Sequence, residues 1–255
     1  MAAAGNGQWN VEIAESWASW FGPHGGVIAG MAVEVAEMEA SGANVRSMDL
    51  RFLGKPRIGQ MQLFTSIYEV GRTTRVIDIA FVQDQTVASA SVTLGRIGPA
   101  SNLDRPGLSQ ANVRPPNECD LWELPLEILP VGTHLEIRPT DGPLPGSGSE
   151  EARMRAWLST RPKMSINAAV LAVLADALPP AIFTTMTEPV ATPTVSMSMY
   201  ITADLRQHDL HEVLGHTWNV HTGGGWSVDD TELRDGAGQL LATARQSRRI
   251  LLPRD

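Results

Sequence analysis

The sequence contains a single cysteine, Cys119, among 255 residues, and it lacks both long apolar runs and basic clusters. One cysteine excludes a disulfide framework and a cysteine metal cluster. No apolar stretch reaches the roughly 18–20 residues that span a bilayer. The first residues carry neither the basic nor the apolar part of a signal peptide. We therefore expect a cytoplasmic protein with no membrane span.

Positive charge is also scarce, with 20 Lys and Arg residues against 28 Asp and Glu residues and a net charge of −8. This balance disfavours a nucleic-acid partner. The sequence has no G-x-S-x-G nucleophile elbow, no phosphate-binding loop and no complete dinucleotide fingerprint. His208 and His211 can share a helical face, but no H-E-x-x-H motif or third ligand accompanies them. We expect no metal and no cofactor.

The order of predicted elements occurs twice along the chain. After His24, the apolar residues Val27, Met31, Val35 and Met38 fall at helical spacing. Four strands are predicted next, at 45–53, 61–70, 74–84 and 86–94, followed by a Pro/Gly/Asn-rich linker at 96–119. The second round has strands at 133–138 and 153–158, a helix at 166–178 and strands at 194–201, 213–221, 226–234 and 239–250. Pro179-Pro180 ends that helix.

The two rounds can be aligned residue by residue. Ser47-Met48 matches Ser196-Met197, and the run 87–90 (VASA) matches 241–244 (LATA). One helix followed by an antiparallel meander, repeated once, predicts an α+β fold in which each sheet wraps around its helix. The alanines of the two matched runs would let the helix approach closely.

Polar residues replace apolar ones in the second round. Gln246 stands where the first round has Val92, and Thr194 stands opposite Val45. Asp176 is a third polar residue, beside the apolar stripe of the second helix. Each has a plain structural alternative: an amide bonded to backbone, a threonine that starts a strand, and a solvated carboxylate at a helix end.

Several stretches resemble the double-hotdog, thioesterase-like superfamily that includes the bacterial type II acyl-CoA thioesterases. The matching segments are HGGVIAG, SMDLRFLGKPRIG, THLEIRPTDGP, VLADALPPA, TVSMSMYITA and GGGWSVDDTELRDGAGQLLATARQSRRI. The likeness covers most of residues 20–250. It implies a double hotdog, that is, two repeats of a long central helix wrapped by an antiparallel sheet. The repeats would be residues 1–110, including the linker, and residues 111–255, which would carry the active site.

The resemblance also implies an Asp–Thr–Gln site, whose members match Asp176, Thr194 and Gln246. Asp176 would act as a general base on a water that Thr194 and Gln246 orient. Backbone N–H groups at Gly25 and Gly26 are candidates to bind the oxyanion of the substrate, although both glycines can instead serve close packing. His24 is expected to be a polar helix cap. The sequence departs from the type II pattern in one respect, because residues 196–197 (SM) stand where members often carry Asp and His.

The implied reaction is hydrolysis of an acyl-CoA with a hydrophobic acyl group, without a cofactor. The resemblance further implies a homodimer. Two alternatives stay open: an enoyl-thioester hydratase, for which we find no hydratase-type Asp/His arrangement, and a non-catalytic acyl-CoA-binding protein.

Overall fold

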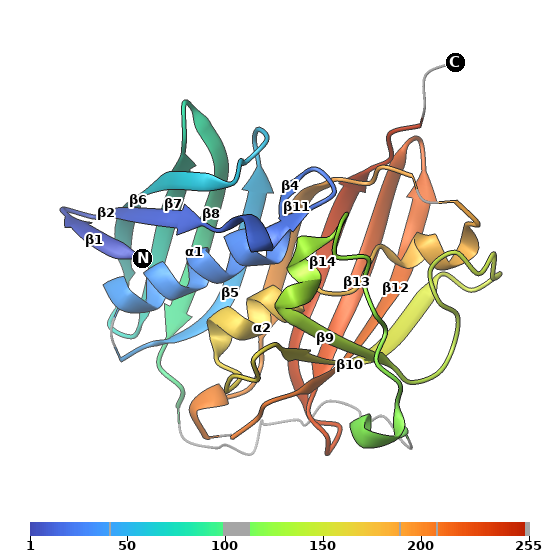
Figure 1. The fold of residues 1–255 in the computed structure, drawn as a ribbon. Helices are drawn as coiled ribbons and strands as arrows, with labels where there is room; N and C mark the ends of the chain where they lie inside the picture. Colours follow the sequence, from blue (N-terminus) through green and yellow to red (C-terminus); the bar gives the residue numbers. More distant parts are fainter. Residues whose placement is uncertain (41, 99–112, 189, 208, 253–255) are drawn as a thin grey trace.

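The structure, a computed structural model, describes residues 1–40, 42–98, 113–188, 190–207 and 209–252 (Figure 1). Twelve strands form one antiparallel sheet in the order β1-β2-β6-β7-β8-β5-β11-β14-β13-β12-β10-β9. Their bounds are β1 Ala2–Gly5, β2 Gln8–Ile13, β5 Asn44–Phe52, β6 Gly59–Val70, β7 Thr74–Val82, β8 Thr86–Gly95, β9 Leu135–Pro139, β10 Arg153–Thr160, β11 Thr194–Ile201, β12 Val213–Gly223, β13 Trp226–Arg234 and β14 Leu240–Arg249. Two short strands, β3 (Ala18–Ser19) and β4 (Gly22–Pro23), form a separate hairpin.

Two α-helices, α1 (Gly25–Glu39) and α2 (Ala168–Leu174), lie against the same face of the sheet and contact each other (Figure 1). Glycines on α1 permit this contact: a Cβ at Gly26 would lie 2.6 Å from the Val173 carbonyl oxygen, and one at Gly30 would lie 2.9 Å from the Val173 side chain. The remaining helical turns are η1 Glu15–Trp17, η2 Pro116–Glu118, η3 Pro130–Thr133, η4 Ala181–Thr185 and η5 Leu205–Gln207. No helix among the described residues has the length and apolar character needed to cross a membrane.

The first half of the structure (residues 1–98) and the second half (residues 113–252) have the same connectivity. In the first, α1 is followed by β5, β6, β7 and β8, which lie in the sheet as β6-β7-β8-β5. In the second, α2 is followed by β11, β12, β13 and β14, which lie as β11-β14-β13-β12. Strand β2, upstream of α1, pairs with β6, and strand β10, upstream of α2, pairs with β12, so each extends the outer edge of its half. The two halves join where β5 pairs with β11.

The strand register relates individual residues of the two halves. In the first half, Met48 of β5 pairs with Val92 of β8. In the second half, Met197 of β11 pairs with Gln246 of β14. The sequence alignment had matched these same residues. The register also shifts at matching places, between residues 45 and 47 and between residues 194 and 196.

The structure changes two details of the predicted helices. The second helix is shorter than the predicted 166–178, because the Asn167 side chain accepts a hydrogen bond from the Val170 N–H at its start and the chain tightens after Leu174. Met38, expected on the buried stripe of the first helix, is 47% exposed. The buried face of α1 is instead broad and continuous in its first turns, because the sheet and α2 cover it from different sides.

The predicted linker at 96–119 lies largely outside the described residues, and so does the boundary expected at residue 110. Strand β2, which was not predicted, pairs with β6 and buries Val11 and Ile13. The predicted strands otherwise correspond to observed ones, with ends that differ by a few residues.

Candidate functional site

Asp176 and Gln246 are in direct contact. Asp176 lies two residues beyond the end of α2, and its side chain is 10% exposed. Its Oδ1 atom accepts a hydrogen bond of 2.5 Å from Gln246 Nε2, and its Oδ2 atom accepts one of 2.8 Å from the backbone N–H of Gly26. Both oxygens of a nearly buried carboxylate therefore have N–H donors, which fix its orientation.

Gly25 and Gly26 lie against this carboxylate at the start of α1. A Cβ at Gly25 would lie only 2.8 Å from Asp176 Oδ2, so a larger residue there would displace the acid. Both glycines were candidates to offer N–H groups to a substrate, and the Gly26 N–H donates to Asp176 in this structure. The Gly25 N–H donates to no group in the described part of the chain.

His24 occupies the N-cap position of α1, but its side chain makes no capping hydrogen bond, so the expected role is wrong. Its Nε2 atom lies 2.9 Å from the backbone carbonyl oxygen of Asp176 and 3.6 Å from Oδ2. Because a carbonyl oxygen only accepts, the contact assigns the proton to Nε2. Nδ1 is buried and has no partner among the described residues. The imidazole thus links the first turn of α1 to the backbone that carries the acid.

Thr194 joins the other two predicted residues through an arginine. Its Oγ1 atom accepts a hydrogen bond of 2.6 Å from Arg248 Nη1. Arg248 Nη2 donates to Gln246 Oε1 and lies 3.9 Å from Asp176 Oδ1. Within the described residues, Thr194 makes no direct hydrogen bond to Asp176 or Gln246. The structure therefore brings the three predicted residues into one network, with Arg248 at its centre.

Arg248 and its partner Asp229 were not predicted from the sequence. The side chains are 6% and 0% exposed, and Arg248 Nε donates to Asp229 Oδ2 at 3.2 Å. Asp229 Oδ1 also accepts a hydrogen bond of 2.8 Å from Asn219 Nδ2. A signal was present, because Arg248 follows Gln246 by two positions and therefore shares its face of the predicted strand.

The matching positions of the first half are aliphatic. The strand register equates Val45, Ile77, Val92 and Leu94 with Thr194, Asp229, Gln246 and Arg248, respectively. All four aliphatic side chains are buried. The second half has therefore replaced a packed apolar surface with a polar network at equivalent places in the sheet.

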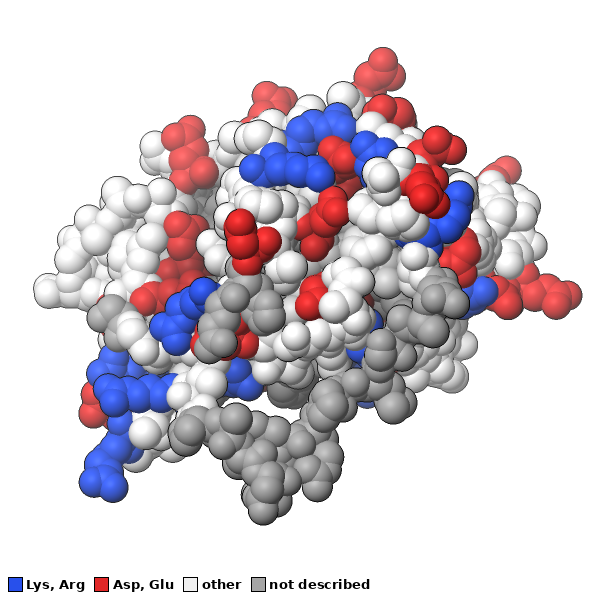
Figure 2. Space-filling view, turned by 90° about the horizontal axis from the view of Figure 1, so that it is seen from below, with Lys and Arg blue, Asp and Glu red and all other residues white. Residues whose placement is uncertain are grey.

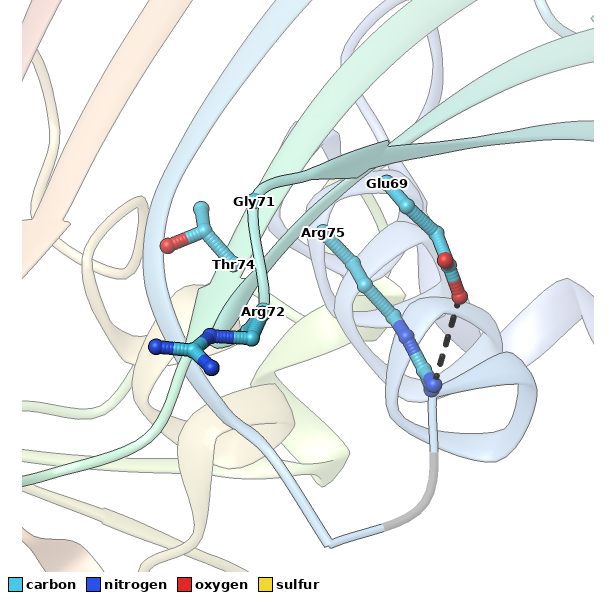
Figure 3. Close-up of a pocket in the computed structure, with 5 residues that line it drawn as sticks. All are labelled: Glu69, Gly71, Arg72, Thr74 and Arg75. Carbon is cyan, nitrogen blue, oxygen red and sulfur yellow. Dashed lines mark ion pairs between the residues drawn. The ribbon is translucent and has the colours of Figure 1, made fainter.

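Other surface features give weaker indications of a functional site than this polar network does. An open hollow of about 230 Å³ at the β6–β7 turn is lined by exposed and half-buried residues. Figure 3 shows Arg75 paired with Glu69 there, while Arg72 points away from them. Figure 2 shows basic side chains in small groups beside acidic ones on the face seen from below, so the described residues form no extended basic surface there. In the described ranges, no three His, Cys, Asp or Glu side chains could hold a metal together. His208 lies outside those ranges.

Comparison with known protein families matches residues 13–95 to the acyl-CoA thioesterase N-terminal domain and residues 110–250 to the acyl-CoA thioesterase C-terminal domain. The chain belongs to the acyl-CoA thioesterase family. It is therefore a thioester hydrolase. No curated protein matches the sequence.

Several solved structures align with nearly the whole of this thioesterase. A conserved protein of unknown function with the hot dog fold from Alicyclobacillus acidocaldarius aligns with a TM-score of 0.87 and 20% identity, over 97% of this chain and 94% of the other. An acyl-CoA thioesterase II from Mycobacterium marinum aligns with a TM-score of 0.75 and 15% identity, over 99% and 96%. A tesB protein from Mycobacterium avium subs paratuberculosis aligns with a TM-score of 0.78 and 14% identity, over 98% and 96%.

Both family domains of the thioesterase contribute to the network. Gly26 lies in the segment matched to the N-terminal domain, whereas Asp176 and Gln246 lie in the segment matched to the C-terminal domain. Met197, at the position where the sequence departs from the type II pattern, is buried with its sulfur 3.8 Å from Gln246 Nε2. An apolar thioether therefore covers one side of the amide.

Proposed function

We propose that this protein hydrolyses acyl-CoA thioesters at Asp176, with a water that Thr194 and Gln246 help to orient. The observation that carries the proposal is the chain of contacts from Gln246 through the Asp176 carboxylate to the Gly26 N–H. These contacts hold the carboxylate in a fixed orientation where little solvent reaches it, and a positioned carboxylate can act as a general base. The two similar halves are interpreted as two hotdog repeats, one ending near residue 110, of which the second supplies the base.

The proposed reaction has two steps. Asp176 takes a proton from the water as the water oxygen bonds to the thioester carbonyl carbon, and the carbonyl π electrons move to oxygen. The tetrahedral intermediate then collapses, the carbon–sulfur bond breaks, and the proton held by Asp176 passes to the departing CoA sulfur. The products are a carboxylic acid and free CoA. The Gly25 N–H, at the first residue of α1, is the candidate donor to the oxyanion.

An assay of CoA thiol release tests the proposal, with short, medium and long acyl-CoAs as substrates. We expect the wild type to hydrolyse at least one series, and Asp176→Asn to lower kcat by about 10²–10⁴-fold, the usual contribution of a positioned base. Asp235→Asn is the matched control. Asp235 is also a nearly buried carboxylate that accepts two backbone N–H groups, but it lies in the β13–β14 turn.

The same experiment distinguishes the alternatives. Binding of acyl-CoA without turnover by either protein would identify a binding protein, and addition of water to an enoyl-CoA would identify a hydratase. Full hydrolysis by folded Asp176→Asn would refute the proposed base. The homodimer and the cytoplasmic location stay predictions.

A further inference from the structure

Arg248 occupies the centre of the polar network. One guanidinium donates to Thr194 Oγ1, to Gln246 Oε1 and to Asp229 Oδ2, through three different nitrogens. A guanidinium is planar and rigid, so three such contacts fix the relative positions of its partners. Two of those partners belong to the proposed site, and the third, Asp229, lies on β13 beside Gln246 of β14.

The matching positions of the first half are filled without a charged pair. Burial of an arginine and an aspartate removes two charges from water, and well-packed apolar residues at such places are often equally or more stabilising. In the first half the matching positions hold buried apolar side chains, because Leu94 and Ile77 occupy them and are 0% exposed. The pair Arg248–Asp229 therefore calls for a role other than stability.

The contacts indicate what that role is. An amide can be turned so that its oxygen and nitrogen exchange places. Because Arg248 has only N–H donors, it requires the oxygen of Gln246 on its own side, which leaves Nε2 directed at Asp176. The reversed amide would set its oxygen against the carboxylate. Arg248 also donates to Thr194 Oγ1, so the hydroxyl proton of Thr194 is left to bond another acceptor, such as a water.

We propose that Arg248 is a positioning residue of the thioesterase, which Asp229 holds in place and which sets the orientation of Gln246 and Thr194 toward the attacking water. This inference rests on the proposed function. Asp229 contributes because its Oδ2 bond to Nε fixes the plane of the guanidinium, while Asn219 fixes Asp229 in turn. Neither Arg248 nor Asp229 needs to contact the substrate.

The decisive variant is the double substitution Arg248→Leu with Asp229→Ile, which installs the residues of the first half. We expect it to unfold at a temperature no lower than the wild type and to lose about 100-fold in kcat, the effect of misplacing reacting groups by about 1 Å. The KM for acyl-CoA should stay unchanged. A folded double variant with wild-type kcat would overturn the proposal.

A second variant keeps the test valid should the double substitution fail to fold. Arg248→Lys retains the charge, but one ammonium on a flexible stem cannot reproduce three contacts in a fixed plane, so kcat should fall while KM is retained. Wild-type kcat in this variant would equally contradict the proposal. Arg234→Leu is the matched control: Arg234 is also 6% exposed at its side chain and paired, with Glu232, and its loss should leave kcat per folded molecule unchanged.

The outcome separates this inference from the proposed function. Loss of activity in Asp176→Asn together with full activity in both Arg248 variants would remove only the positioning role. Activity that survives Asp176→Asn would remove the proposed base itself.

Discussion

The Asp176 carboxylate, just beyond α2, accepts a hydrogen bond from the backbone N–H of Gly26, in the first turn of α1. The two residues are 150 positions apart in the chain and belong to different halves of the molecule. The donor side of this contact is a helix start, where free N–H groups and the helix dipole favour an anion. One half therefore helps to position the acid that the other half supplies.

Gly26→Ala should disrupt this contact. The added Cβ would lie 2.6 Å from the Val173 carbonyl oxygen, so α1 and α2 must separate. We expect a loss of about 1–3 kcal/mol in the free energy of unfolding, the usual cost of overpacking, and a lower kcat. Denaturant unfolding and thiol release measure the two effects. Gly98→Ala is the control, because a Cβ there meets nothing within 4 Å, and wild-type behaviour in Gly26→Ala would contradict the close approach of the helices.

Thr194→Val installs the residue that the first half has at the matching position, Val45. The shapes are nearly the same, but the hydroxyl that accepts from Arg248 is lost. We expect the protein to stay folded and kcat to fall by about 10–100-fold, which corresponds to about 1.4–2.7 kcal/mol.

The reciprocal change, Val45→Thr, is the control for Thr194→Val. It buries a hydroxyl in the first half, where Val45 is 2% exposed, and should lower stability by about 1–3 kcal/mol without altering kcat. Circular dichroism melts and steady-state kinetics on both variants measure these outcomes. Equal kinetic effects of the two substitutions would show that the halves do not differ in function.

His24→Phe should weaken the link between α1 and the backbone of Asp176. The substitution keeps an aromatic ring but removes the donor to the Asp176 carbonyl oxygen, at a cost of about 1–3 kcal/mol for an unsatisfied buried acceptor. We expect a lower melting temperature and a reduced kcat. His24→Gln keeps an N–H donor and should recover part of both, whereas identical behaviour of the two variants would show that the hydrogen bond is unimportant.

His216 should make the folded protein sensitive to acid. Burial, reinforced by the nearby Arg155 and Arg153, lowers the pKa of His216 from 6.5 to about 4, although Glu232 and Asp141 oppose the change. Between these two pH values the unfolded chain binds a proton that the folded protein does not bind. The contribution of the neutral His216 to the free energy of unfolding is therefore complete above about pH 6.5, and it is lost as the pH falls toward 4.

His216→Gln should flatten this part of the stability profile, because glutamine does not titrate. Melting temperatures between pH 4 and pH 7 should fall less steeply in the variant than in the wild type, and the exposed His221 provides a control through His221→Gln. Parallel profiles of wild type and His216→Gln would exclude the histidine as a cause of acid sensitivity.

Much of the fold could be predicted because its signals are local. β-Branched residues and bounding glycines identified the strand around residues 61–70, and a glycine run precedes the strand at 226–234. Small-residue runs allowed the halves to be aligned. The short N-terminal strand Gln8–Ile13 was missed because its partner, β6, lies about 50 residues further along the chain and nothing nearby indicates pairing. The length of α2 was overestimated because apolar periodicity continues past Leu174 into a turn that is not α-helical.

The candidate site was only partly predictable, for a physical reason. Asp176, Thr194 and Gln246 stood out as polar residues on faces expected to be apolar. Arg248 did not, because a basic residue near a strand end usually reaches solvent. Its burial depends on Asp229, and that pairing is formed by two strands whose register the sequence alone does not reveal. The donation of the Gly26 N–H to Asp176 likewise depends on how α1 and α2 meet.

The junction between β5 and β11 also determines when the molecule can be completed during synthesis. Ser198 and Asp49, which are hydrogen-bonded across this junction, are 149 positions apart. At roughly 5–20 residues per second, a ribosome takes roughly 7–30 s to make the chain between them. During that time the emerging first half presents β5 with an unpaired edge, the kind of surface on which chains aggregate. The nascent chain should therefore be most vulnerable to aggregation, and most dependent on chaperones, until β11 has left the ribosome and covered that edge.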